Sequence, residues 1–288
     1  MRSGVLLLVL LAGCRPAPER LRVTFLDVGQ GDSAVIEAPS GRVVLIDGGG
    51  APGSDSQAGT DPGSRIVVPF LRSRGISTVD LLVATHPDDD HVQGLLAVSE
   101  RLVVRAALDS GLPASPESPM GRLRALWKAR GVTVHRGHRG QRFDLGGSTV
   151  LEILHPETPW LTGTRSDDNN NAILMRLVYK KVRVLFAADA EREAEQSLLE
   201  ARQELAAQVL KVGHHGGRTS TGERFLRVIG PQAAILSCGR ENRFGHPHKE
   251  TLQRLLARNV TIFRTDQQGA LTLESDGELF SVHPLVRL

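Results

Sequence analysis

The chain has 288 residues, which is long enough for one large layered domain with an ample core. Hydrophobic residues make up 40% of the sequence and charged residues 23%, as is ordinary for a soluble globular protein. The formal net charge is only +3 at pH 7, so the charge balance by itself does not demand a nucleic-acid partner.

The first twenty residues differ in composition from the rest. The stretch MRSGVLLLVLLAGC has one arginine, an apolar run from Val5 to Leu11 and then small residues, which is the layout of a secretory signal. The run is too short for a permanent transmembrane helix, which needs about 20 residues. Its last four residues resemble a bacterial lipoprotein box, although an ordinary signal peptide that contains a cysteine would look the same.

The lipoprotein resemblance implies how the mature chain is anchored. Residues 1–13 would be the signal peptide, and Cys14 would be lipidated and become the new N-terminus. Residues 14–20 would form a short tether, and residues 21–288 the folded domain. We therefore expect a protein of the cell envelope, on its periplasmic or extracellular face. It would touch the membrane only through its lipid and need no obligate protein partner.

From Leu21 onward, alternating and short apolar runs predict mostly strands, with helices between the later ones. Strands are expected at 22–28, 33–39, 42–49, 80–86, 103–110, 132–137, 148–156, 172–179, 182–189, 233–239 and the start of 209–217. Helices are expected at 92–102, 121–131, 191–206, 221–230 and 249–259. Residues 261–278 are expected to close the fold as a hairpin, and the Gly-, Ser- and Pro-rich segment 48–64 to be a long loop.

This order of elements predicts an α/β (α+β) fold. Two sheets packed face to face with helices outside would bury all of these apolar strands, which gives a four-layer αββα sandwich. Polar residues stand where several strands end, and functional sites are commonly built on such a rim. Among them, Asp27, Asp32 and Asp47 are expected to hold loops through backbone N–H groups rather than to bind metal.

The segment THPDDDHVQG, residues 85–94, carries the most distinctive chemistry of the chain. It contains the pattern His86-x-Asp88-x-Asp90-His91, directly after an apolar strand and before a helix. Neighbouring carboxylates repel one another at neutral pH, so a folded chain balances them with a cation or with water. Imidazole and carboxylate groups within one turn can converge on two divalent ions. The alternative is a solvated acidic loop, which the flanking histidines disfavour.

Several motifs in the same order resemble the metallo-β-lactamase superfamily. They are closest to the exported hydrolase domain of ComEC-type DNA-internalisation competence proteins. The motifs are FLDVGQGDSAVIEAPSGRVVLIDGG, THPDDDHVQG, NNNAILMRLVYKKVRVLFAAD, LKVGHHGGRTS, GHPHKETL and FRTDQQGALTLESDG, and together they span about residues 21–280. The resemblance implies a metallo-β-lactamase-like sandwich. Because those competence proteins also carry a long membrane-spanning region, we expect this chain to be the hydrolase module alone.

The resemblance further implies a binuclear metal centre. Its ligands would be His86 and Asp88 for the first ion, Asp90 and His91 for the second, Asp189 as a bridge, and His215 completing the second site. His215 is favoured over His214 because it directly precedes Gly216. Carboxylate ligands suit Mn²⁺ and imidazoles suit Zn²⁺, so the identity of the two ions stays open.

The first metal site departs from the superfamily pattern. The superfamily usually has a histidine near residues 169–171, where this chain has three asparagines. This site is therefore expected to be open or rich in oxygen ligands.

The implied chemistry is hydrolysis by an activated water. Asp90 would orient the water and accept its proton, and His214 or His246 would protonate the leaving group. The expected substrate-binding residues are Asn171, Arg218, Arg243 and His248, since guanidinium groups pair well with phosphate.

The expected function is thus an exported, binuclear, metal-dependent hydrolase, most simply a phosphodiesterase or nuclease with a phosphodiester such as DNA as substrate. A β-lactam or lactone hydrolase is the alternative within enzymes. A catalytically inactive module that binds DNA or an envelope polymer is the alternative outside them.

Overall fold

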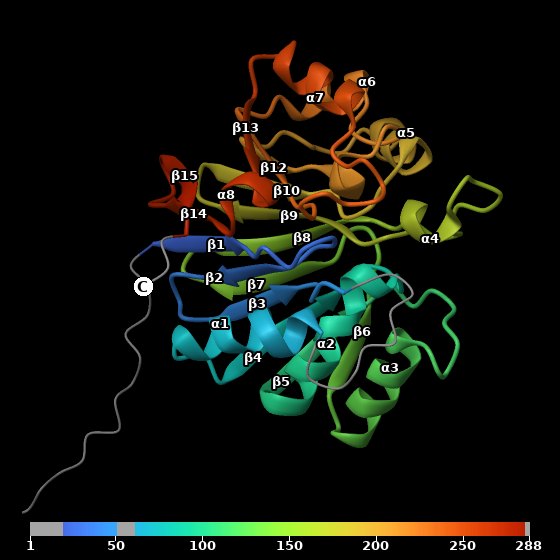
Figure 1. Ribbon diagram of the computed structural model, residues 1–288, viewed down its shortest axis with the longest axis vertical. Helices are drawn as coiled ribbons and strands as arrows, with labels where there is room; N and C mark the ends of the chain where they lie inside the picture. Colours follow the sequence, from blue (N-terminus) through green and yellow to red (C-terminus); the bar gives the residue numbers. More distant parts are fainter. Residues whose placement is uncertain (1–19, 51–60, 286–288) are drawn as a thin grey trace, which may run out of the picture.

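Two β-sheets lie face to face with helices on both outer sides in the computed structural model of the chain (Figure 1), which describes residues 20–50 and 61–285. This is the expected αββα sandwich. The signal peptide, Cys14 and most of the tether fall on residues 1–19, outside the described residues, as do residues 51–60 of the expected loop.

The first sheet has eight strands in the order β15-β14-β1-β2-β3-β4-β5-β6. Their bounds are β1 Leu21–Phe25, β2 Ala34–Glu37, β3 Val43–Ile46, β4 Thr78–Ala84, β5 Val103–Asp109, β6 Thr133–Arg136, β14 Leu271–Ser275 and β15 Phe280–Pro284. Pairing is parallel from β3 to β6 and antiparallel elsewhere. Strand β3 reads VVLI and is buried along its length, as expected for a strand covered on both faces.

The second sheet has seven strands in the order β13-β12-β11-β10-β9-β8-β7. Their bounds are β7 Arg142–Gly146, β8 Thr149–His155, β9 Leu174–Tyr179, β10 Val182–Phe186, β11 Val209–Lys211, β12 Ala233–Leu236 and β13 Thr261–Arg264. Strands β10 to β13 run parallel, and β7 to β10 pair antiparallel. Each sheet thus joins an antiparallel part to a parallel part.

Helices cover the outer face of each sheet. Those on the first sheet are the continuous pair η1 Gly63–Val67 and α1 Val68–Ser73, with α2 Asp89–Arg101 and α3 Pro119–Ala129. Those on the second are α5 Arg192–Glu200, α6 Glu223–Ile229 and α7 Lys249–Leu256. Short turns of helix lie between strands, at α4 Asp167–Asn170, η2 Gly213–Gly216 and α8 Thr265–Gln268.

The largest apolar cluster lies between the two sheets. Strands β1 to β4 contribute side chains such as Val23, Phe25 and Val83, and β8 to β11 contribute side chains such as Met175 and Phe186. The rings of Phe25 and Phe186 meet across the interface with their centroids 5.9 Å apart. Burial of these groups is what holds the two sheets together.

The prediction of a hairpin at 261–278 is wrong. Strand β13 pairs with β12 in the second sheet, whereas β14 pairs with β1 in the first sheet, and α8 carries the chain across. The hairpin in this region is formed by β14 with β15. The helix expected at 191–206 also ends early, at Glu200, and Arg202 takes a left-handed backbone with φ 51°.

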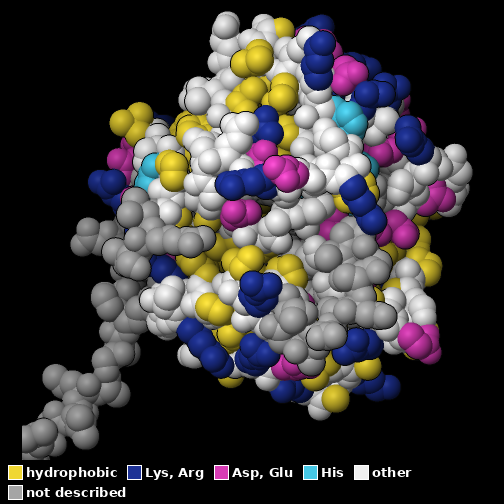
Figure 2. Space-filling model, in the orientation of Figure 1, with side chains coloured by type: hydrophobic (Ala, Val, Ile, Leu, Met, Phe, Trp, Pro, Cys, Tyr) yellow, Lys and Arg dark blue, Asp and Glu magenta, His cyan; other side chains and the backbone are white. Residues whose placement is uncertain are grey.

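Charged side chains are mixed over the face seen in Figure 2, where Lys and Arg lie among Asp and Glu rather than in one continuous basic patch. Among the described residues, no helix is both long and apolar enough to cross a membrane.

Candidate metal centre and active site

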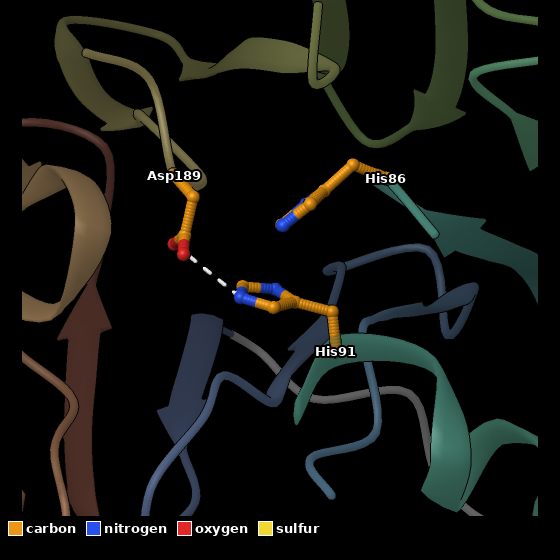
Figure 3. A group of neighbouring side chains, drawn as sticks. All are labelled: His86, His91 and Asp189. Carbon is orange, nitrogen blue, oxygen red and sulfur yellow. Dashed lines mark ion pairs between the residues drawn. The ribbon is translucent and has the colours of Figure 1, made fainter. Parts of the chain in front are cut away.

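The candidate ligands meet at one rim of the sandwich, although they come from both sheets. His86 follows β4, and His91 lies in the first turns of α2. Asp189 follows β10, and His215 follows β11. The carboxyl ends of parallel strands in each sheet therefore bring two distant halves of the chain to a single point (Figure 3).

The expected ligands lie close together. Asp189 places one oxygen 3.3 Å from His91 Nε2 and the other 3.4 Å from His215 Nε2. The Nε2 of His215 is also 3.4 Å from Asp90 Oδ2. Two of the sets of ligand atoms that converge within 4.8 Å consist of expected ligands alone, namely His86 with His91 and Asp189, and Asp90 with His91 and His215.

Asp88 occupies the N-cap position of α2, where a carboxylate usually accepts a hydrogen bond from the helix. Its side chain makes no such bond, and Oδ2 lies 3.6 Å from His86 Nε2 instead. The carboxylate is thus available to a cation beside His86.

Three of the imidazoles are oriented in the same way. The Thr85 hydroxyl donates to Asp47, so it must accept the proton on His86 Nδ1, at 2.9 Å. His91 Nδ1 donates to Asp47 over 2.9 Å, and His215 Nδ1 donates to the carbonyl of Ser237 over 3.0 Å. In each ring a fixed Nδ1–H leaves Nε2 facing the rim, as metal-binding histidines require.

These inward-facing atoms have no hydrogen-bond partner. They are the Nε2 atoms of His86, His91 and His215 and the Oδ1 atom of Asp189, all buried. Buried polar groups are nearly always satisfied, so four unpartnered atoms that face one another fit a bound cation. The donor set of imidazole and carboxylate suits a divalent metal.

The electrostatics of the centre agree with this fit. Burial raises the pKa of Asp189, but the imidazoles of His215 and His91 outweigh it and hold that pKa well below its usual value. Burial lowers the pKa of His91, but Asp189 and Asp47 raise it well above its usual value. Protons on the imidazoles therefore balance the carboxylates in the metal-free protein, and a cation would displace them.

Asp47 has a role that the sequence did not indicate. It was expected to hold a loop, and it does accept the backbone N–H of Thr85 at 2.9 Å. Its second oxygen also holds His91, a contact that depends on the close approach of α2. A Cβ on Gly94 would lie 2.0 Å from the carbonyl oxygen of Gly48, so only glycine allows the helix to pack this near.

His214 points toward the same centre from a strained backbone. Its φ is 46° and that of His215 is 53°, values that are uncommon for residues other than glycine and that cluster at functional sites. His214 Nε2 lies 3.8 Å from Asp189, and Nδ1 lies 3.1 Å from Glu191, which also accepts the Thr219 hydroxyl. Glu191 is therefore an orienting residue that no sequence motif indicated.

Two hollows flank His214. One, of about 390 Å³, is lined by Pro87, Asp88, Asp89, Asp90, Asp189, His214, Arg243 and Phe244. The other, of about 310 Å³, is lined by Arg165, Ser166, Asn169, Glu191, His214, Gly217, Arg218, Thr219, His246 and His248. The expected residues Arg218, Arg243, His246 and His248 thus all border the site, on either side of His214.

The histidines of GHPH continue the ring cluster outward. The ring centroid of His246 lies 5.4 Å from that of His214, and that of His248 lies 5.1 Å from His246. Burial and the nearby histidines lower the pKa of His246 to about 4. His246 is therefore neutral at pH 7 in the metal-free protein. Burial lowers the pKa of His214, but the carboxylate of Asp189 outweighs it and raises that pKa above its usual value.

Asn171 does not fit its expected substrate-binding role. Its amide is fully used by the backbone, because it accepts from Leu161 N and donates to the carbonyls of Leu161 and Asp167. Asn169 is the asparagine that lines the hollow, with a buried Oδ1 that lacks a partner. Successive residues of a helical turn point about 100° apart, so only one of the three can face the site.

Comparison with known proteins gives a consistent picture. A model of the metallo-beta-lactamase superfamily matches residues 26–240. ComE operon protein 3 of Bacillus subtilis (strain 168) is 32% identical over 274 residues, 91% of this chain and 34% of that protein. Competence protein ComA of Neisseria gonorrhoeae is 30% identical over 272 residues, 93% of this chain and 35% of that protein. The chain spans about a third of the length of these curated relatives.

Solved structures share the fold at low identity. A metallo hydrolase from the hyperthermophilic archaeon Ignicoccus hospitalis KIN4/I superposes with a TM-score of 0.54 at 13% identity, covering 87% of this chain and 98% of that one. At that identity the likeness concerns the fold alone.

Proposed function

Because the chain belongs to the metallo-β-lactamase superfamily, we propose that it is a metal-dependent hydrolase and that its substrates are phosphodiesters. The observation that carries the proposal is the convergence of unpartnered Nε2 atoms from His86, His91 and His215 on the carboxylate of Asp189. Three histidines with fixed tautomers around one buried aspartate have no evident structural purpose without a cation.

Two divalent ions, Zn²⁺ or Mn²⁺, are proposed to bind here. His86 and Asp88 would hold the first ion, and Asp90, His91 and His215 the second. Asp189 would contact both, since its two oxygens face different histidines. Bound there, the ions would supply Lewis acidity that activates water and polarises a phosphoryl oxygen.

The chain's own residues would manage the protons. Burial raises the pKa of Asp90, but the nearby imidazoles of His215 and His91 outweigh it and lower that pKa, so the carboxylate stays ionised and can accept a proton from water. His214 would give a proton to the leaving oxygen through Nε2, because Glu191 fixes its other nitrogen. His246 lies beside His214, but its lowered pKa of about 4 makes it a poorer proton donor than His214, whose pKa is raised.

Arginines near the centre favour a phosphodiester over other hydrolysable groups. Arg165 and Arg218 line one hollow and Arg243 the other, so an extended anion could be contacted on both sides of His214. One relative is named a competence protein, and the resemblance of the sequence motifs to DNA-internalisation proteins makes DNA the first polymer to test.

Hydrolysis by the metal-reconstituted protein tests this proposal. Purified protein stripped with a chelator is reloaded with Zn²⁺ or Mn²⁺ and assayed on bis-p-nitrophenyl phosphate, single-stranded DNA and the β-lactam nitrocefin. We expect metal-dependent cleavage of the first two. Cleavage of nitrocefin alone would support a β-lactam hydrolase, and metal binding with no cleavage of any substrate would support a binding module.

We also propose that the chain is exported and anchored through a lipid on Cys14. The support is the layout of residues 1–14, which lie outside the described part of the structure.

A further inference from the structure

We infer that Lys211 and Asp32 form a buried positioning pair that holds His215 ready for metal binding from behind the ring. The inference rests on the proposed metal centre and adds two residues that do not face the substrate. Neither residue is among the expected ligands, and Asp32 was expected only to hold its loop.

The pair is fully enclosed. Lys211 ends β11, and its side chain is only 4% exposed. Its Nζ lies 2.6 Å from Asp32 Oδ2 and donates to the carbonyl of Val212 over 2.9 Å. Asp32 Oδ1 lies 3.3 Å from His215 Nδ1 but accepts no hydrogen bond from it, because that N–H donates to the carbonyl of Ser237. The carboxylate therefore stands between an ammonium and the imidazole, with one oxygen toward each.

The backbone fixes where this carboxylate points. The Asp32 N–H donates to the carbonyl of Asp90 over 3.2 Å, and the Asp32 carbonyl accepts from Gly49 over 2.8 Å. The loop of Asp32 is thus tied on both sides to segments that carry other parts of the centre. The Ser237 carbonyl keeps the proton on Nδ1 of His215, and the negative charge of Asp32 beside that N–H raises the basicity of Nε2.

His91 and His215, which both lie beside Asp189, are supported by different chemistry. Asp47 holds His91 and is itself fixed by neutral donors, the N–H and hydroxyl of Thr85. Asp32 is fixed by a full positive charge. The ammonium of Lys211 thus balances the buried carboxylate of Asp32 directly, at 2.6 Å.

A direct role of Asp32 as a metal ligand is the main competing explanation, because its oxygen lies within 4.8 Å of ligand atoms of Asp189 and His215. Two observations oppose it. Asp32 meets Nδ1 of His215, whereas Asp189 and Asp90 meet Nε2 on the opposite side of the ring. The ammonium of Lys211 at 2.6 Å would also repel a divalent ion on the same carboxylate.

The small space around the pair also argues against contact between Lys211 or Asp32 and the substrate. Lys211, Asp32 and Ser237 line a cavity of only about 10 Å³ between the sheets. That volume is close to the smallest that holds a single water molecule, so no substrate group can reach the ammonium there.

The test uses three variants, Lys211→Met, Asp32→Asn and the double variant. Each single variant leaves one buried charge without its partner, so both the stability of the metal-free protein and its affinity for Mn²⁺ or Zn²⁺ should fall. In the double variant both charges are gone, and stability should recover substantially. Metal affinity measured by calorimetry should stay about 10–100-fold below wild type, because His215 still lacks its carboxylate.

The ion pair between Arg176 and Glu152 provides the matched control. It is similarly buried, with side chains 7% and 14% exposed and 2.8 Å between the charged atoms. Arg176→Met with Glu152→Gln should change stability while leaving metal affinity within about twofold of wild type, as for a pair that contacts no ligand.

Two outcomes would overturn the inference. Recovery of metal affinity together with stability in the double variant would make the pair purely structural. Loss of one whole metal equivalent in Asp32→Asn, with both retained in Lys211→Met, would make Asp32 a ligand. Metal binding is measured without substrate, so a wild-type protein that binds metal but cleaves no phosphodiester would refute the proposed function and leave this assignment intact.

Discussion

Replacing Asp189 by asparagine tests the centre most directly, because this carboxylate touches imidazoles from both sheets. Its oxygens lie 3.3 Å from His91, 3.4 Å from His215 and 3.8 Å from His214. Asparagine keeps the shape but loses the charge. We expect metal content, measured by plasma mass spectrometry, to fall from about two ions per chain, the number a two-metal mechanism needs. Activity on bis-p-nitrophenyl phosphate should fall by several orders of magnitude.

The metal-free protein gives a second, independent readout of the same change. From the sequence alone, neutralising Asp189 should relieve repulsion with Asp88 and Asp90 and so stabilise the fold. The structure reverses this expectation, because three imidazoles are nearer partners. These contacts are buried ion pairs, and removing one partner of such a pair costs about 3–5 kcal/mol, so Asp189→Asn should lower the free energy of unfolding by up to that amount at pH 6.

The loss should depend on pH with a definite sign. Asp189 raises the pKa of His91 and His215, so the stability that it supplies is present below pH 6.5 and disappears as pH rises through their raised pKa values. Denaturant unfolding of chelator-treated protein from pH 6 to 10 measures this. Asp80→Asn, the same change near the start of β4 and so at the end of that strand away from His86, is the control and should retain both metals. Two retained metals with nearly full activity in Asp189→Asn would refute the bridging assignment.

Three further predictions concern other parts of the chain. Cys14→Ser should move the protein from the membrane to the soluble fraction, and retention through detergent-free washing would contradict a lipid anchor. Burial raises the pKa of Glu195 from 4.5 to about 7 despite bonds from the N–H groups of Thr221 and Gly222. Relative to Glu195→Gln, the wild type should therefore lose about 3 kcal/mol of stability as pH rises from 4.5 to 7, and parallel stability curves would show that no such shift exists. His214→Gln should lower kcat about 10²–10⁴-fold on an alkyl phosphodiester but far less on bis-p-nitrophenyl phosphate, whose leaving group needs no proton. Equal losses on both substrates would argue against His214 as the acid.

Local patterns were enough to predict most strands and helices, because apolar periodicity reports which face of an element is buried. They were not enough at the C-terminus, where a hairpin was expected at 261–278. Strand β14 pairs with β1, so Leu271 meets Phe25 across nearly the whole length of the chain. Pairing of that kind depends on the closed sheet and leaves no mark on the nearby sequence.

The same limit applies to the site. Four expected ligands, His86 to His91, are neighbours in the sequence, so their convergence could be anticipated from one motif. Asp32 and Lys211 are separated by 179 positions yet lie 2.6 Å apart, so no spacing rule could join them. The three asparagines at 169–171 could not be told apart either, since the choice depends on how α4 is rotated against the hollow.

Because the expected metal ligands come from both sheets, a bound ion would also affect the stability of the fold. An ion held by His86 from the first sheet and Asp189 from the second would be a cross-link that closes a loop of about 100 residues. Links across loops of that length stabilise folds strongly when they are covalent. The described residues contain no disulfide, since Cys238 is free and buried. By mass action, each ion at 1,000 times its dissociation constant would add about 4 kcal/mol to the stability of the folded chain. The supply of metal would then govern what fraction of the protein is folded, as well as whether it is active.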